Sequence, residues 1–207
     1  MSRRQFGVAN TTILAIDPDY EIVKSSNMIN YIKGDLFSHR VLKAGIVSIL
    51  AHACNCRGSW GAGVAAIFQR KFPSTYEKHY KYCKEHSSNP AGLLGTTQLI
   101  PSSPSDAGNK NGENNVYVAC LFTSDFAGAK KLGPQDIVRH TDAAMRDLIH
   151  QISAFEANNV EFERNDAGQI IVNMPKINAG LFAVPWSESE KVLLKYDTLQ
   201  INIYVID

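Results

Sequence analysis

Residues 52–64 read HACNCRGSWGAGV, and they lead from an apolar segment, residues 46–53, into a helical pattern that begins at Gly63. Glycine also occupies positions 58 and 61, and a residue without Cβ lets backbone amides approach an anion closely. The helix that follows presents the positive end of its dipole to the same charge. This stretch therefore predicts a strand, an anion-binding loop and a helix in succession.

Two further segments have the same pattern, a strand followed by a loop with small residues. Residues 174–186 read MPKINAGLFAVPW and run toward another helix, and residues 32–37 read IKGDLF. In open α/β sheets, ligands collect beyond the carboxyl ends of the strands, where such loops converge. We expect the loops after residues 53 and 174 to close on one pocket from two sides. Asp35 is either an ordinary turn residue or an acceptor for the amino group of a base.

Segments rich in β-branched residues alternate with helical patterns along the chain. Strands are expected at residues 13–16, 27–33, 46–53, 96–100, 116–123, 170–174 and 199–206. Helices are expected at residues 63–71, 74–86, 134–157 and 187–196. Several strands lack alternation and look buried on both faces. The fold class is therefore α/β, with helices layered on a sheet.

Two local features set the expected helix starts and the longest loop. Two helices begin with capping boxes, Ser74 with Glu77 and Ser187 with Glu190, in which each side chain satisfies an orphan amide of the first turn. Residues 101–115 are rich in Ser, Pro, Asn and Gly and carry little apolar surface. We expect them to form a mobile loop between two strands.

Composition and charge exclude several classes of function. The 207 residues are 44% hydrophobic, which suits one buried core and one domain. Basic residues number 21 and acidic residues 20, so no net field gathers nucleic acid or an anionic membrane. No apolar run reaches the roughly 18 residues of a membrane span. The four cysteines lack the spacing of a secreted disulfide framework, which indicates a reducing compartment, the cytoplasm, with the nucleus as an open alternative.

The three loops, taken together and in this order, resemble the macrodomain family of ADP-ribose-binding proteins. The resemblance covers roughly residues 31–206. Within the family, residues 52–63, 120–124 and 175–186 look most like the fungal ADP-ribose 1''-phosphate phosphatases. The resemblance implies a phosphoric monoester hydrolase that converts ADP-ribose 1''-phosphate, a by-product of tRNA splicing, to ADP-ribose and phosphate.

The resemblance also implies a fold and domain boundaries. We expect a three-layer α/β/α sandwich with a central mixed sheet over residues 28–207, preceded by an N-terminal extension over residues 1–27.

The substrate site that the resemblance implies uses all three loops. Asp35 would accept a hydrogen bond from the adenine amino group, with Gly34 and Leu36 framing the base. Asn55 would face the distal ribose and position a hydroxyl and a water. The residues expected to hold the rest of the substrate are Ala53, Cys54, Asn55, Trp60, Gly61, Ala62, Gly63, Val64, Ala65, Ile177, Asn178, Ala179, Gly180, Leu181, Phe182 and Ala183.

His52 is a candidate proton carrier, since an imidazole titrates near neutrality and His52 stands three residues before Asn55. Because a strand alternates faces, the two side chains need not point the same way. If they point to opposite faces, His52 is a hydrogen-bonded core residue and not a proton carrier.

Other activities stay open at this point. The chain could remove ADP-ribose from ADP-ribosylated protein, act as a noncatalytic reader of ADP-ribose or, in another class, be an NAD-dependent oxidoreductase. The glycohydrolase branch of the family relies on a lysine and an aspartate where this chain has Ser124 and Phe182. Without that amine, its covalent route is unavailable. Residues 61–66 match a G-x-G-x-x-A dinucleotide fingerprint, but seven residues separate them from the strand.

We expect neither a cofactor nor a metal. His79, Cys83 and His86 would share one face of a helix and have ligand chemistry that suits zinc. Lysines interleave with them and would repel a dication, and the neighbouring tyrosines favour packing.

Overall fold

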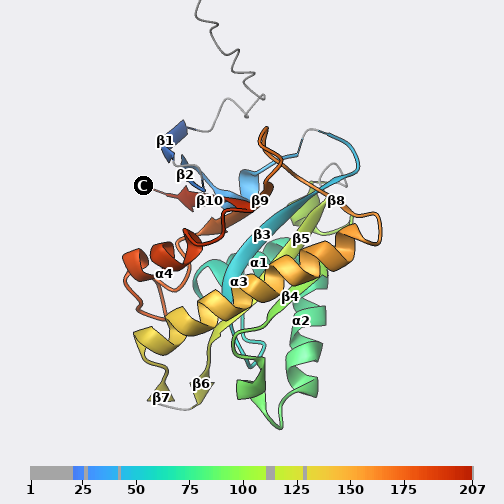
Figure 1. Cartoon of the computed structure of the whole chain (residues 1–207). Coiled ribbons are helices and arrows are strands. Elements are labelled where there is room, and N and C mark those ends of the chain that lie inside the picture. The colour runs from blue at the N-terminus through green and yellow to red at the C-terminus, as the bar shows by residue number, and fades with distance from the viewer. Residues whose placement is uncertain (1–20, 26–27, 42, 111–114, 128–129, 207) are drawn as a thin grey trace, which may run out of the picture.

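The fold is built on one mixed sheet (Figure 1). The computed structural model describes residues 21–25, 28–41, 43–110, 115–127 and 130–206. The strands of the sheet run in the order β1-β2-β10-β9-β3-β5-β4, with the short β8 beside β3. Their bounds are β1 Glu21–Ser25, β2 Ile29–Lys33, β3 Ile46–Asn55, β4 Thr97–Pro101, β5 Val116–Ser124, β8 Glu161–Phe162, β9 Ile170–Pro175 and β10 Leu199–Val205. The five strands from β2 to β5 are parallel, and the edge strands β1 and β4 are antiparallel to their neighbours.

Helices cover both faces of this sheet. In Figure 1, α3 (Pro134–Glu156) crosses the front of the sheet beside α4 (Trp186–Leu193). The helices α1 (Gly63–Lys71) and α2 (Pro73–Glu85) pack on the opposite face. The short hairpin of β6 (Phe126–Ala127) and β7 (Lys130–Lys131) stands apart from the sheet. The expected three-layer α/β/α sandwich with a mixed sheet is confirmed.

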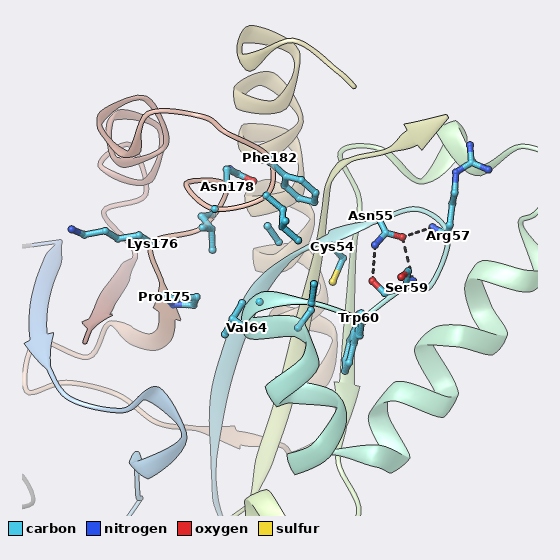
Figure 2. A pocket seen from close by; sticks show the side chains of 18 residues that line it. Cys54, Asn55, Arg57, Ser59, Trp60, Val64, Pro175, Lys176, Asn178 and Phe182 are labelled. Atoms are coloured by element: carbon cyan, nitrogen blue, oxygen red, sulfur yellow. Dashed lines mark hydrogen bonds between the residues drawn. The ribbon is translucent and has the colours of Figure 1, made fainter. Parts of the chain in front are cut away.

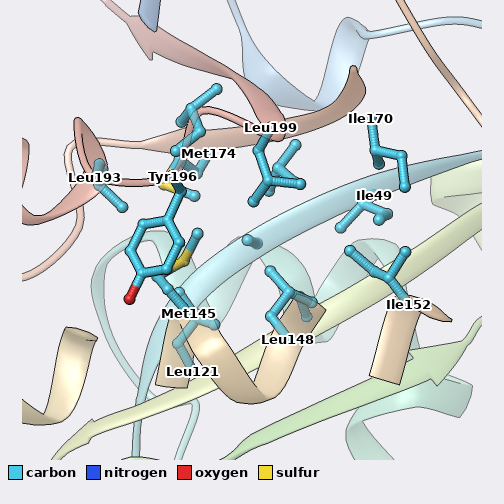
Figure 3. Packing of buried hydrophobic residues seen from close by; sticks show 14 of the residues in the cluster. Ile49, Leu121, Met145, Leu148, Ile152, Ile170, Met174, Leu193, Tyr196 and Leu199 are labelled. Atoms are coloured by element: carbon cyan, nitrogen blue, oxygen red, sulfur yellow. The ribbon is translucent and has the colours of Figure 1, made fainter. Parts of the chain in front are cut away.

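The strand β3 shows why its sequence lacks alternation. Ile49 and Ala51 point into the core under α3, and Leu50 and Cys54 point into the core under α1 and α2. Both faces are therefore buried, as parallel strands in α/β folds require. Figure 3 shows the first core, in which the apolar stripe of α3, Met145, Leu148 and Ile152, lies against the sheet.

The observed elements follow the sequence pattern closely, with exceptions near the N-terminus. The expected strand at residues 13–16 lies outside the described residues. The strand β1 falls inside residues 1–27, the segment set apart as an extension, and it pairs with β2 through Ile22↔Ile32 and Ser25↔Asn30. A boundary at residue 27 therefore separates two paired strands. No helix in the described ranges is both long and apolar enough to cross a membrane.

The predicted capping boxes are wrong. The helix α2 begins one residue earlier, at Pro73, and the Ser74 hydroxyl donates to Asp106 instead of capping its own helix. The helix α4 begins at Trp186, and Glu190 accepts a hydrogen bond from the Tyr31 hydroxyl. In both cases a partner distant in sequence takes the side chain that the local motif would use.

Residues 101–110 pack against the helices, which contradicts the expected mobile loop. Asp106 is 3% exposed and accepts hydrogen bonds from the backbone amides of Ser74 and Ser103 at 3.2 and 3.0 Å. Gly108 lies so close to Phe72 that a Cβ there would be 2.2 Å from a ring carbon. Polar residues of this loop cap the start of α2. Composition alone cannot distinguish polar residues that cap a helix from polar residues that face solvent.

We predict that Asp106→Ala lowers the free energy of unfolding by about 2–3 kcal/mol, because it removes the acceptor of three partly buried donors of Ser74 and Ser103. Urea denaturation of both proteins measures the loss. The matched control is Ser105→Ala, next to Asp106 and exposed, which should stay within about 0.5 kcal/mol of the parent. Equal stabilities for the parent and Asp106→Ala would contradict the capping role.

Candidate functional site

Two cavities meet at the carboxyl ends of the central strands. The larger, about 490 Å³, is lined by residues of both predicted loops, from Ala53 to Ala65 and from Pro175 to Phe182 (Figure 2). The smaller, about 420 Å³, is lined by Gly34, Asp35 and Leu36 together with β10 residues. Val64, Pro175 and Lys176 line both cavities. The structure thus brings the three predicted segments to one continuous groove.

Asn55 organises the first loop. The register of β3 against β5 shifts between Cys54 and Asn55, so the strand turns there. The Asn55 Oδ1 atom accepts from the backbone amides of Arg57 and Ser59 at 2.9 and 3.3 Å, and its Nδ2 donates to the Ser59 carbonyl at 2.7 Å. Figure 2 shows these bonds closing a tight turn at the mouth of the cavity. Since an amide nitrogen carries two hydrogens, one donor of Asn55 is left for the cavity.

The turn is also clamped from outside. The Arg57 guanidinium makes a two-pronged contact with Asp125, from Nε to Oδ1 and from Nη2 to Oδ2, each at 3.0 Å. Asp125 is 7% exposed. Planar, bidentate pairs of this kind fix geometry as well as adding energy. The clamp ties the first loop to the end of β5.

The start of α1 borders the larger cavity. The helix begins at Gly63, with Ala62 extended at φ −149° as its N-cap. Gly63 has φ +58°, in the left-handed region that glycine adopts without a steric penalty. The first amides of a helix have no partner within the helix. Trp60 to Ala65 line the cavity, so this end of the helix is available to an anion.

Asn178 holds the second loop from inside. It is 5% exposed and has φ +64°, a left-handed conformation. Its Oδ1 accepts from the Thr123 hydroxyl at 2.7 Å, and its Nδ2 donates to the hydroxyls of Thr141 and Ser189 at 2.9 and 3.1 Å. One side chain therefore joins the loop to β5, α3 and α4. Asn178 lines the larger cavity, and its side-chain hydrogen bonds are those of a structural residue.

Cys54 lines the floor of the cavity but is a poor nucleophile. Burial raises the pKa of its thiol well above the usual range, and a hydrogen bond with Cys120 raises it further. The reactive species of a cysteine is the thiolate. A covalent cysteine mechanism is therefore disfavoured.

These loops and their order along the chain are those of a known family. The family model described as Macro domain matches residues 51–193. The chain belongs to the macrodomain family. It is similar to proteins named ADP-ribose 1''-phosphate phosphatase from Debaryomyces hansenii, 58% identical over 87% of this chain and 100% of the relative, and from Candida albicans, 44% identical over 86% and 100%.

Solved macrodomain structures share the fold. The macrodomain of Mycobacterium tuberculosis DarG superposes with a TM-score of 0.58 and 20% identity, over 86% of this chain and 97% of that one. Thermosipho africanus DarTG, solved in complex with ADP-ribose, gives a TM-score of 0.61 at 15% identity, over 90% and 43%. At these identities the likeness supports the macrodomain architecture alone.

His52 lies outside the groove, which removes the reason for assigning it a catalytic role. It is fully buried, its ring stacks on Phe68 at 4.2 Å, and it meets the edge of Trp60 at 4.6 Å. The two side chains point in different directions because of the strand geometry. His52 faces α1, and the shift in register after Cys54 turns Asn55 toward the macrodomain cavity. Proton transfer from His52 to a bound ligand has no direct route.

The other predicted residues either line the groove or lie beside it. Those assigned to the macrodomain groove all line it except Ala179 and Ala183, which lie in the second loop but are not lining residues. Ala183 instead closes the turn, donating its backbone amide to the Gly180 carbonyl at 3.0 Å. In the larger cavity the sequence analysis missed four lining residues: Arg57, Ser59, Pro175 and Lys176. In the smaller cavity it missed five: Phe37, Ile67, Tyr204, Val205 and Ile206. Pro175 and Lys176 directly follow a predicted strand, and that position was the available signal.

We predict that Asn178→Ala and Asn178→Gly both weaken ADP-ribose binding and lower the free energy of unfolding, because each removes three buried hydrogen bonds. Alanine should cost about 1–2 kcal/mol more than glycine, since alanine resists the left-handed backbone. Chemical denaturation and calorimetric titration measure the two quantities. Equal stabilities for the two variants would show that the backbone conformation at residue 178 carries no penalty.

Proposed function

We propose that the protein is a phosphatase that hydrolyses ADP-ribose 1''-phosphate to ADP-ribose and phosphate. The observation that carries this proposal is the groove itself, in which a cavity lined by Asp35 continues into a larger cavity lined by the start of α1 and by Asn55. The similarity to fungal proteins of that name, up to 58% identical over nearly their whole length, supports the same substrate.

The groove orders the substrate from base to phosphate. Asp35 uses Oδ1 to accept from the Phe37 amide at 3.0 Å, which fixes the carboxylate and leaves the other oxygen for the adenine amino group. The diphosphate would lie between the start of α1 and the second loop. Since main-chain amides and one helix dipole carry its charge, the chain needs no strongly basic composition.

Hydrolysis would then take place beside Asn55. The residues that line the larger cavity, within the described part of the chain, include no carboxylate and no imidazole. The free Asn55 amide hydrogen and the loop amides would orient the terminal phosphate and a water. The water oxygen bonds to phosphorus and the bond from phosphorus to the anomeric oxygen breaks. One proton of the water passes by way of a phosphate oxygen to the anomeric oxygen, which leaves as the hydroxyl of ADP-ribose. Positioning supplies most of the rate in this scheme.

The other activities fit the site less well. Ser124, where a glycohydrolase would carry its lysine, is 1% exposed and lies outside the lining of the cavity. Phe182 lines the cavity where that enzyme would carry an aspartate. A reader of ADP-ribose would use the same groove without turnover, and the phosphate assay below separates it from an enzyme. Nothing in a macrodomain groove favours an NAD-dependent oxidoreductase.

The proposal also includes the source of the substrate. We place it as a by-product of tRNA splicing, released in the cytoplasm, on the basis of the resemblance to the fungal phosphatases. All four cysteines are buried free thiols, which agrees with a reducing compartment.

We predict that Asn55→Ala and Asn55→Asp lower the rate of phosphate release from ADP-ribose 1''-phosphate by about 100-fold, the typical cost of removing one transition-state donor. Aspartate keeps the oxygen that accepts from the amides of Arg57 and Ser59 but loses the hydrogen bond from Nδ2 to the Ser59 carbonyl, so the folding of both variants is checked by circular dichroism. Phosphate release and the Kd for ADP-ribose, which lacks the terminal phosphate, are measured together.

Asn158→Asp, an exposed position on the same chain, controls for the change in charge. Turnover should fall far more than affinity for ADP-ribose. If turnover is unchanged in both Asn55 variants, the assigned role is wrong. If the parent protein binds ADP-ribose and releases no phosphate, the protein is a reader.

We predict that Asp35→Asn weakens ADP-ribose binding by about 10–100-fold, the value of a hydrogen bond to a charged acceptor. The loss should be much smaller for the analogue in which hypoxanthine replaces adenine, because that base lacks the amino group. Titration calorimetry with both ligands measures the difference, and Asp166→Asn, at an exposed turn, is the control. Equal losses for the two ligands would remove Asp35 from adenine recognition.

A further inference from the structure

A cluster of soft metal ligands lies beneath the floor of the groove. The Nε2 or Nδ1 atom of His52 and the Sγ atoms of Cys54 and Cys120 all lie within 4.8 Å of one another, and all three residues are buried. His52 and Cys54 are two residues apart on β3, and Cys120 lies on β5, paired with His52. The cluster therefore spans two neighbouring strands on one face of the sheet.

The imidazole has poor hydrogen-bond partners for a fully buried group. Its ring stacks on Phe68, and within the described residues its two nitrogens contact only the Cys54 sulfur, at 3.7 Å from Nδ1 and 3.5 Å from Nε2. Sulfur is a weak hydrogen-bond acceptor, so this arrangement gives the imidazole nitrogens only weak hydrogen bonds. Buried polar groups normally have oxygen or nitrogen partners. One fully buried imidazole and two buried thiols within 4.8 Å of one another are residue types that bind zinc.

The geometry suits a tetrahedral ion. With zinc bonds of about 2.3 Å to sulfur and 2.0–2.1 Å to nitrogen, a tetrahedral site places a nitrogen and a sulfur ligand about 3.6 Å apart. The observed separation of His52 Nε2 and Cys54 Sγ is 3.5 Å. The charge also balances, because two thiolates neutralise one dication in a buried site.

An entry path exists through the substrate groove. Cys54 lines the larger cavity, while Cys120 is fully enclosed behind it. A metal ion can reach Cys54 from the groove before Cys120 and His52 close around it. The zinc site shares only Cys54 with the substrate site, since His52 and Cys120 line neither cavity.

We propose that His52, Cys54 and Cys120 supply three ligands of a zinc site that joins β3 to β5 under the groove, with a water as the fourth ligand. On binding, Zn²⁺ replaces the protons of the two thiols, which pass to solvent, and the imidazole binds as the neutral form. This proposal replaces the expectation, drawn from sequence, of a protein without a metal. It does not depend on the proposed phosphatase activity.

The test uses the full chain, reduced and stripped of metal with a chelator, and titrated with Co²⁺ and then Zn²⁺. We expect one equivalent of Co²⁺ to give the thiolate charge-transfer absorption and the visible bands of a tetrahedral thiolate site, and Zn²⁺ to displace it. Zn²⁺ should also raise the midpoint of thermal unfolding. Cys120→Ser should lose the charge-transfer bands and bind zinc more than about 100-fold more weakly, since even indirect partners of a metal contribute 10–100-fold.

Cys83→Ser is the matched control, because Cys83 is an equally buried thiol that contacts His79 on α2 and lies outside the three-ligand cluster. It should keep the stoichiometry and the spectrum of the parent. Cobalt bands without thiolate character, bands that persist in Cys120→Ser, or a disulfide between Cys54 and Cys120 in freshly purified protein would each overturn the proposal. A folded Cys120→Ser, judged by circular dichroism, makes the loss of binding interpretable.

Discussion

The parallel pairing of β3 with β9 is the constraint on which the site depends. Ile49 lies opposite Val172 and Leu50 opposite Asn173, and the Asn173 side chain donates to the Ile49 carbonyl at 3.3 Å. Parallel neighbours end at the same edge of a sheet, less than about 5 Å apart. The two loops that leave these strands must therefore face each other. A shift of one residue in this register would exchange the side chains of β3 between the two cores and displace the loops relative to each other.

This constraint explains why much of the architecture could be predicted from the sequence. A strand buried on both faces reads as a continuous apolar run, and a loop of small residues after it marks the carboxyl end. Residues 46–53 and 170–174 both show this pattern, and the helix expected at residues 63–71 has the observed bounds. Local periodicity and one topological rule were enough to bring residues 120 positions apart to one groove.

What could not be predicted depended on partners distant along the chain. Ser74 and Glu190 carry the local pattern of a capping box, yet Asp106 and Tyr31 take their polar groups. Asn178 shows the same limit, since a sequence reading places it in a ligand loop without revealing the three hydroxyls that surround its amide. Hydrogen-bond partners of buried polar side chains are set by tertiary structure, and no spacing rule reports them.

The different positions of Asn55 and His52 follow from the two faces of β3, each of which packs against a different layer of helices. Up to Cys54, even-numbered residues of β3 face α1 and α2, so His52 is enclosed by Phe68 and Trp60. After the shift in register, the chain curls into a turn held by Asn55 and clamped by Arg57 and Asp125. The side chains of Asn55 and Arg57 hold the shape of the turn, and residues 60–65 after it line the cavity. A site made this way recognises charge through backbone geometry, so its rigidity, more than any single side chain, determines how well it holds a substrate.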